Sequence, residues 1–386
     1  MPHTDVPSDS GLQWAERLLR FDTVSTRSNL ALIECIADHL RTLGVQPRLT
    51  YDDGRHKANL FATLGVGKPG GVVLSGHTDT VPWDGQAWTS DPLVPVRRDD
   101  RLVARGSADM KGFIGLVVAQ AQAFLEADLP HAIHLAFSYD EEIGCFGVRH
   151  LLADLRDAGI APHACIVGEP TGMRPAIAHK GVHRWRCTVK GHAAHSSQTP
   201  SSVNAIEAAA RIVAHIADLA DELREREPRQ PGFDVPYSTA SVGLMQGGIA
   251  DNVVPEDCRF QYEFRDLPGT DLAALQRRVA GYAASLEPAM HAVDPATGVR
   301  FDPICSIPSF GAEADDPAVR LAQRLSGDDG STLVAFGTEA GLFQRAGIPT
   351  VVCGPGQIAQ AHQADEYVTF EQLARCEAFL QALAGR

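Results

Sequence analysis

Histidines and carboxylates follow several apolar runs of this sequence, a placement that puts polar groups at the ligand-binding edge of an α/β sheet. Five of them offer ligand atoms that suit a metal ion: His77, Asp109, Glu142, Glu169 and His362. This set contains imidazole nitrogens and carboxylate oxygens but no cysteine sulfur, a combination suited to Zn²⁺ and also to Co²⁺ or Mn²⁺. Any one of the 15 histidines is more often a surface or core residue, but nearly all of these five positions lie just past a predicted strand. Together they favour a metal site.

The elements that must carry these residues alternate between strand and helix. Short apolar runs indicate buried strands, and longer amphipathic or apolar runs indicate helices. The expected strands are 59–64, 71–75, 131–139, 164–168 and 350–353, and the expected helices are 30–43, 113–127, 147–158, 317–325 and 370–384. This alternation predicts an α/β fold, with a mixed, largely parallel sheet flanked by helices.

The pattern changes between residues 179 and 309. Here the expected order is strand, helix, strand, strand, helix, strand, which is the split βαβ pattern of a ferredoxin-like α+β sandwich. The predicted elements are 182–190, 203–226, 238–247, 258–265, 271–286 and 299–307. We therefore expect a discontinuous first domain, 1–178 and 310–386, interrupted by an inserted domain, 179–309.

Composition excludes several function classes. The chain has 386 residues, and 34 Lys and Arg against 48 Asp and Glu give a formal charge of −14, which argues against nucleic acid as a partner. No leader peptide and no apolar run long enough to span a membrane is predicted, so we expect a cytoplasmic protein. The eight cysteines form no C-x-x-C pair, which favours free thiols over a finger-type zinc site. The glycine-rich stretch 65–70 matches no nucleotide-binding fingerprint.

Several motifs resemble those of the co-catalytic zinc metallohydrolases, a family that includes acetylornithine deacetylase, succinyl-diaminopimelate desuccinylase, aminoacylase and glutamate carboxypeptidase. These motifs are SGHTDTVP at 75–82, GSADMKG at 106–112, DEEIG at 140–144, GEPT at 168–171, and His362. The resemblance extends over nearly the whole chain and is greatest for the acetylornithine deacetylase branch, on the stretches 28–33 and 76–92. It implies a metal-dependent exopeptidase-like fold with two divalent ions, Zn²⁺ or alternatively Co²⁺.

The resemblance assigns each ligand a place. Asp109 would bridge the two ions, His77 and Glu169 would complete the shell of one, and Glu142 and His362 that of the other. A cis peptide bond is expected after Asp109.

Two further carboxylates receive roles from the resemblance. Glu141 would be the general base, which takes a proton from the attacking water and passes it to the leaving amine. Asp79 lies two residues after His77 and would accept the other imidazole N–H, fixing the tautomer.

The inserted domain would be the family's lid and dimerisation domain, which implies a homodimer. In the segment 191–197, His195 would stabilise the oxyanion, reaching a partner's active site, with His192 as its competitor. Asn252 and Arg265 match positions that bind the substrate carboxylate, although the local pattern alone equally suits a turn Asn and a surface Arg. Thr338 would donate a hydrogen bond in the substrate pocket.

The resemblance implies an amidohydrolase that converts N2-acetyl-L-ornithine to L-ornithine and acetate in arginine biosynthesis. Glu rather than Asp at position 169 favours deacylation or carboxypeptidase chemistry over aminopeptidase chemistry. The alternatives are a deacylase of another N-acyl amino acid (succinyl-diaminopimelate, acetylcitrulline or an acylmethionine) and a glutamate-type carboxypeptidase. A non-enzymatic, metal-dependent scaffold on the same fold is the alternative from a different class.

Overall fold

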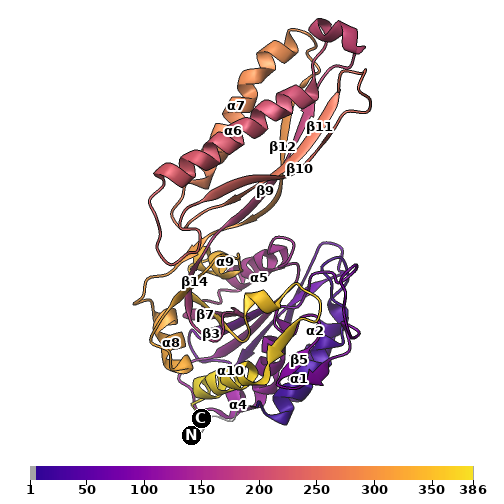
Figure 1. Cartoon of the computed structure of the whole chain (residues 1–386). Helices are drawn as coiled ribbons and strands as arrows, with labels where there is room; N and C mark the ends of the chain where they lie inside the picture. The colour runs from indigo at the N-terminus through magenta and orange to yellow at the C-terminus, as the bar shows by residue number, and fades with distance from the viewer. Residues whose placement is uncertain (1–5, 386) are drawn as a thin grey trace. The chain divides into compact units, whose positions relative to one another are not determined.

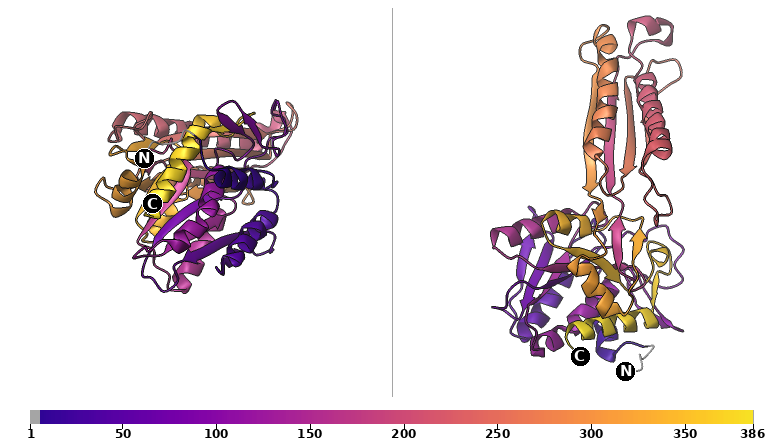
Figure 2. Two further views of the ribbon diagram at one scale, coloured as in Figure 1. Left: turned by 90° about the horizontal axis from the view of Figure 1, so that it is seen from below. Right: turned by 90° about the vertical axis from the view of Figure 1, so that its left-hand side faces the viewer.

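The computed structural model describes residues 6–385, and Figures 1 and 2 show the course of the chain through them. The chain divides into two compact units. One extends through Ala178 and continues with Phe310–Val334 and from Thr338 onward, and the other comprises His179–Ser309 with Ala335–Gly337. No helix among the described residues is both long enough and apolar enough to cross a membrane.

The first unit is built around a nine-stranded sheet with the order β1-β2-β6-β3-β7-β15-β8-β13, in which β14 pairs with β8. Its strands are β1 (Arg48–Tyr51), β2 (Ala58–Leu64), β3 (Val72–His77), β6 (Ile133–Ser138), β7 (Ala164–Pro170), β8 (Ala176–His179), β13 (Phe310–Gly311), β14 (Thr332–Val334) and β15 (Thr350–Gly354). β3 is parallel to β6 and β7, and β15 is parallel to β7, whereas β1, β2 and β8 join antiparallel. The predicted mixed, largely parallel sheet is confirmed.

Helices cover both faces of this sheet. They are α1 (Asp9–Leu19), α2 (Leu30–Thr42), α3 (Lys111–Ala119), α4 (Ala121–Glu126), α5 (Phe146–Asp157), α8 (Pro317–Ser326), α9 (Ala340–Arg345) and α10 (Phe370–Leu383), with a 3₁₀ turn at Ile358–Gln360. The crossover from β3 to β6 and the crossover from β6 to β7 run in opposite directions along the sheet. Because such crossovers are right-handed, α3 and α5 lie on opposite faces. A separate small sheet joins β4 (Val96–Arg98), β5 (Arg101–Val103) and β16 (Tyr367–Thr369).

The helix expected at 113–127 is two helices, α3 and α4, which meet at Gln120. The amide of Gln120 hydrogen-bonds to the carbonyls of both Leu116 and Val117, which tightens the last turn of α3 and ends it. No glycine or proline marks this break, so the sequence pattern did not predict it.

The second unit has the predicted order of a ferredoxin-like sandwich. Its elements are β9 (Val182–Lys190), a 3₁₀ turn at Ser196–Ser201, α6 (Ala205–Arg226), β10 (Thr239–Gly247), β11 (Asp257–Arg265), α7 (Leu272–His291) and β12 (Gly298–Ile307). The strands form an antiparallel sheet in the order β10-β11-β9-β12, and α6 and α7 pack against it and each other. α7 continues beyond its expected end at 286 because Pro288 still accepts a hydrogen bond from the amide of Ala292.

Candidate metal centre

Three adjacent parallel strands of the first unit bring the candidate ligands to one edge of its sheet. His77 is the last residue of β3, Glu141 and Glu142 follow β6, and Glu169 is the sixth of the seven residues of β7. Because the carboxyl ends of parallel strands meet at one sheet edge, side chains far apart in the sequence converge there. His77 is 1% exposed and Glu169 is 3% exposed, so this end of the cluster lies out of solvent.

Asp109 lies between two imidazoles. Its Oδ1 is 2.7 Å from Nε2 of His77, and its Oδ2 is 3.1 Å from Nε2 of His362. The peptide bond after Asp109 is cis, as the motif resemblance implied. Each carboxylate oxygen therefore faces a different histidine, which is the arrangement that a carboxylate bridging two ions needs.

The two histidines have separate carboxylate neighbours. Nε2 of His77 is 3.6 Å from Oε1 of Glu169, and Nε2 of His362 is 3.1 Å from Oε2 of Glu142. The side chain of His362 is 47% exposed, whereas that of Glu142 is 7% exposed. The cluster is thus a chain of ion pairs with Asp109 at its centre, open to solvent at the His362 end.

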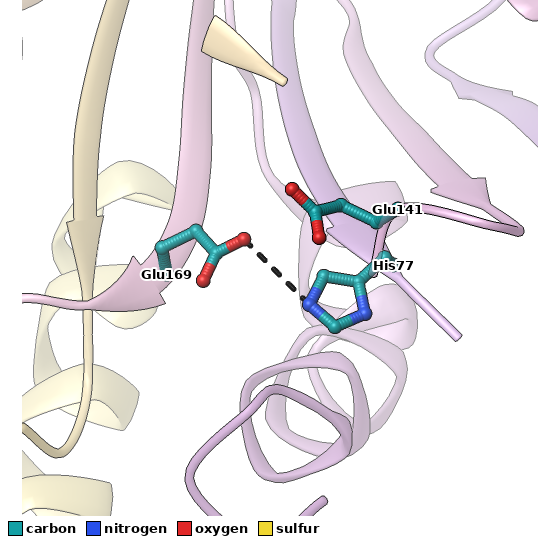
Figure 3. Close-up of side chains that lie close together, drawn as sticks. All are labelled: His77, Glu141 and Glu169. Atoms are coloured by element: carbon teal, nitrogen blue, oxygen red, sulfur yellow. Dashed lines mark ion pairs between the residues drawn. The ribbon is translucent and has the colours of Figure 1, made fainter. Parts of the chain in front are cut away.

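Figure 3 shows the buried end of this cluster, where the carboxylates of Glu141 and Glu169 both lie near the imidazole of His77. One ligand atom from each of these three residues lies within 4.8 Å of the other two, and the same holds for His77, Asp109 and Glu142. Two overlapping groups of three ligand atoms therefore share His77. Glu141 also accepts a hydrogen bond from the thiol of Cys145, with 3.2 Å between Sγ and Oε1.

The cluster is electrostatically incomplete without cations. Burial and the neighbouring carboxylates raise the pKa of Glu169 well above its usual value, and burial does the same to the pKa of Glu141. Hydrogen bonds to Asp109 and Glu142 raise the pKa of His362 to about 11. Burial opposes the ionisation of Asp109, but the imidazoles of His77 and His362 hold its pKa below its usual value.

The cluster gathers four carboxylates, from Asp109, Glu141, Glu142 and Glu169, around only two imidazoles. Divalent cations would offset that charge directly, and the donors are the nitrogen and oxygen atoms that Zn²⁺ accepts. The residues therefore fit a metal centre.

Asp79 contributes to the site differently from its expected role. Its carboxylate accepts hydrogen bonds from the Ser25 hydroxyl at 2.6 Å and from the amides of Glu141 and Glu142 at 3.1 and 3.3 Å. Nδ1 of His77 lies 3.0 Å from the backbone carbonyl of Asp79 and 3.7 Å from its carboxylate. The side chain of Asp79 thus fixes the loop that carries the two glutamates, while its backbone fixes the imidazole. Ser25 was not predicted, because no local spacing connects it to Asp79.

His195 and Asn252 lie together in the second unit. The amide of Ser196 donates to the carbonyl of Asn252 at 3.0 Å, and His195 forms a bridge with Val253. Nδ1 of His195 accepts from the amide of Ser197 at 3.2 Å, so the neutral ring carries its proton on Nε2.

The competitor of His195 has a different environment. Nδ1 of His192 lies 2.7 Å from Oδ2 of Asp294, in an exposed ion pair.

The other two predicted substrate-binding residues have partners within their own units. Arg265 is half-buried, with its Nε 2.6 Å from Oε1 of Glu263, which also pairs with Arg184. Thr338 belongs to the first unit and is fully buried, and its hydroxyl accepts from the amide of Ala340 at 3.0 Å.

Known proteins resemble this chain in sequence and in fold. The model of peptidase family M20/M25/M40 matches residues 73–386. A protein of Proteus mirabilis named acetylornithine deacetylase is 36% identical over 354 residues, covering 90% of this chain and 87% of its own. One of Myxococcus xanthus with the same name is 37% identical over 371 residues, covering 94% and 93%.

Solved structures show the same architecture at lower identity. An M20 family metallo-carboxypeptidase of Sulfolobus solfataricus matches 98% of this chain and 100% of its own, with a TM-score of 0.76 at 17% identity. A Bacillus subtilis protein described as a dinuclear metal binding peptidase from the M20 family matches 97% and 96%, with a TM-score of 0.68 at 16% identity.

Proposed function

The chain belongs to peptidase family M20/M25/M40 and is a hydrolase that acts on amide bonds, and from this premise we propose that its substrate is N2-acetyl-L-ornithine. The products would be L-ornithine and acetate, in arginine biosynthesis in the cytoplasm. The observation that carries the proposal is Asp109 held between His77 and His362, in a chain whose similar relatives are named acetylornithine deacetylase.

Two divalent ions, Zn²⁺ or Co²⁺, would supply Lewis acidity to the amide carbonyl and lower the pKa of the attacking water. His77 and Glu169 would hold one ion and Glu142 and His362 the other, with Asp109 shared between them. This assignment is supported by the separate ion pairs that each histidine makes with its own glutamate.

Glu141 would move the proton. The residue is 7% exposed, its carboxylate lies beside His77, and the Cys145 thiol donates a hydrogen bond to one of its oxygens. It would take a proton from the water that attacks the acetyl carbonyl and deliver it to the departing amine nitrogen. Burial raises the pKa of Glu141, which makes it a stronger base toward the first proton.

The second unit would provide the groups that hold the substrate. His195 has its Nε2–H free of the Ser197 contact, so it can donate to the oxyanion, acting from the partner chain of a homodimer formed through residues 179–309. Arg265 and Asn252 would bind the substrate α-carboxylate, which an Arg fork matches in shape. Thr338 would donate to the substrate with its hydroxyl hydrogen, since its oxygen already accepts from Ala340.

A panel of acylated amino acids tests the substrate assignment. Metal-reconstituted protein should show its highest kcat/KM on N2-acetyl-L-ornithine among acetylcitrulline, acetylmethionine, succinyl-diaminopimelate and an acylglutamate, with E141Q as the inactive control for each. A higher kcat/KM on any other member of the panel would change the proposed substrate but not the proposed amidohydrolase chemistry.

A further inference from the structure

Glu366 is a fully buried carboxylate with no role in the chemistry described above, although it lies only four residues after His362. Its Oε1 accepts hydrogen bonds from the backbone amides of Gly106, Ala108 and Asp109, at 3.0, 3.0 and 3.1 Å. One oxygen thus holds the loop that contains Asp109, whose carboxylate faces both histidines. A carboxylate that accepts several amide hydrogens is a strong anchor, because each bond is charge-assisted.

The second oxygen of Glu366 is held by Arg105. Nη1 of Arg105 lies 2.6 Å from Oε2 of Glu366, and the two side chains are 1% and 0% exposed. The amide of Ala104 also donates to the Glu366 carbonyl at 3.1 Å. Residues 104–109 and the segment that follows His362 are therefore joined through both side chains and backbone.

Arg105 extends this network to His362 itself. Its Nη2 donates to Oε1 of Gln86 at 2.6 Å, and its guanidinium lies 5.1 Å from the centre of the Trp88 ring. Trp88 Nε1 donates to the same Gln86 oxygen at 3.0 Å. With two donors on its oxygen, the Gln86 amide must direct its nitrogen elsewhere, and Nε2 donates to the backbone carbonyl of His362 at 3.0 Å.

We infer that Glu366 and Arg105 are positioning residues of the metal centre, and that Glu366 governs the affinity of both metal positions while Gln86 governs only that of the His362 position. The inference rests on the proposed two-ion site. The difference follows from what each residue reaches: Glu366 holds Asp109, which both ions would share, whereas Gln86 contacts only the residue that carries one ligand. If the buried ion pair merely stabilised the fold, a variant that still folds would keep both zinc affinities.

Zinc binding, measured apart from catalysis, tests this inference. The apo protein and its variants E366Q, R105K and Q86L are titrated with Zn²⁺ against a chromophoric chelator, and far-UV circular dichroism checks their folding. E377Q is the matched control, because Glu377 is likewise a buried carboxylate that accepts from a backbone amide, but its partners are Ser8 and Gln120.

In E366Q, both zinc affinities should fall, each by roughly 10–100-fold, the range measured when groups that orient metal ligands are removed. In Q86L and R105K, the zinc affinity of the His362 position should fall, and that of the other position should stay within a few-fold of its value in the starting protein. Lysine at 105 keeps the charge opposite Glu366 but cannot contact Glu366 and Gln86 at once. E377Q should match the starting protein at both positions.

Folded E366Q with both affinities unchanged would overturn the inference, as would Q86L that weakens both positions equally or neither. If E366Q does not fold, E366D takes its place under the same criterion, because it keeps the charge but moves the carboxylate back by one methylene. Q86L and R105K then test the His362 position alone. Failure of the proposed function would be seen separately, in the unsubstituted protein. If that protein binds fewer than two zinc ions per chain, the proposed two-ion site is wrong.

Discussion

The candidate metal cluster of the first unit and the predicted substrate residues of the second unit are held by different means. Most members of the cluster lie at strand ends, and each contacts another member. The cluster is largely buried, with His77 and Glu169 only 1% and 3% exposed. His195 and Asn252 are exposed, on loops, and contact neighbours only a few residues away or one adjacent loop. Many contacts therefore fix each residue of the cluster, whereas a few local hydrogen bonds fix His195 and Asn252.

This contrast has a physical origin. Burying several carboxylates together is costly unless each has a partner, so the polypeptide must fix them from many sides. Exposed loop residues have no such desolvation cost, and a few hydrogen bonds to nearby residues on a rigid scaffold can fix them. We therefore expect substitutions in the cluster to act through metal content and those in the second unit to act on turnover or binding with metal retained.

The largest effect is expected at Asp109, on which the whole cluster depends. D109N keeps the size of the side chain but removes the negative charge shared by the two histidines. Both ions should be lost and hydrolysis should fall below detection. Metal content by elemental analysis, beside the E377Q control, checks this. Two retained ions with measurable turnover would contradict the bridging role.

Glu141 belongs to the cluster, but we expect it not to bind a metal ion. E141Q should lower kcat by roughly 10²–10⁴-fold, the contribution usual for a general base, while both ions stay bound. Steady-state kinetics and elemental analysis on the same preparation decide between a base and a ligand. Loss of an ion from E141Q would make Glu141 a ligand, in line with its position beside His77 and Glu169.

His195 and His192 give the sharpest test within the second unit. H195A should lower kcat by roughly 10²–10³-fold, the usual cost of losing one oxyanion donor, with metal content unchanged. H192A should leave kcat near that of the starting protein, since His192 is paired with Asp294. The reverse ranking would exchange the roles of the two histidines.

Arg265 should affect substrate binding most. R265K should lower kcat/KM by about 10–100-fold, mainly through KM, because a lysine cannot make the bidentate contact with a carboxylate. R184K is the matched control, since Arg184 pairs with the same Glu263. Equal losses in both variants would assign the effect to Glu263 rather than to the substrate.

The smallest effect on activity is expected at His179, a residue whose contribution is to stability. Burial lowers the pKa of His179 from its usual 6.5 to about 4. The unfolded chain therefore binds a proton that the folded chain refuses between pH 6.5 and 4, so stability is present above this window and is lost as pH falls through it. Urea unfolding should show that the native protein loses about 3 kcal/mol more than H179Q between pH 7 and pH 4. Equal losses would show that His179 does not carry this acid sensitivity.

Much of the fold could be predicted because burial imposes regular patterns. β9 spans 182–190 as expected, and most other predicted elements agree within a few residues, since apolar periodicity reports which face is buried. Most of the elements that were not predicted are short, such as α9 and the strands of the small sheet. The exception is α1, a helix of 11 residues with buried Leu12, Ala15 and Leu19, which was missed although its pattern is amphipathic.

The candidate cluster was predicted by a rule of topology joined to a family resemblance. Parallel strands end at one edge of a sheet, so the sequence alone predicted that His77, Glu141 and Glu169 lie close together. The supports behind them could not be predicted, because no spacing encodes contacts over long sequence separations. Such contacts join Ser25 to Asp79, Arg105 to Glu366, and Glu366 to the amide of Asp109. Whether His195, Asn252 and Arg265 serve the same site remains a prediction.

The place of β15 in the sheet has a consequence for biosynthesis. β15 lies between β7 and β8, but the ribosome makes it only after the entire second unit. Until then the β7 edge has no partner on that side, and His362 does not yet exist. A nascent chain paused within the second unit would expose this unpaired edge, which is the kind of surface that templates aggregation. Residues 350–362, made after the second unit, therefore supply both the strand that joins β7 to β8 and one predicted ligand of the candidate metal centre. A product truncated before them would lack both.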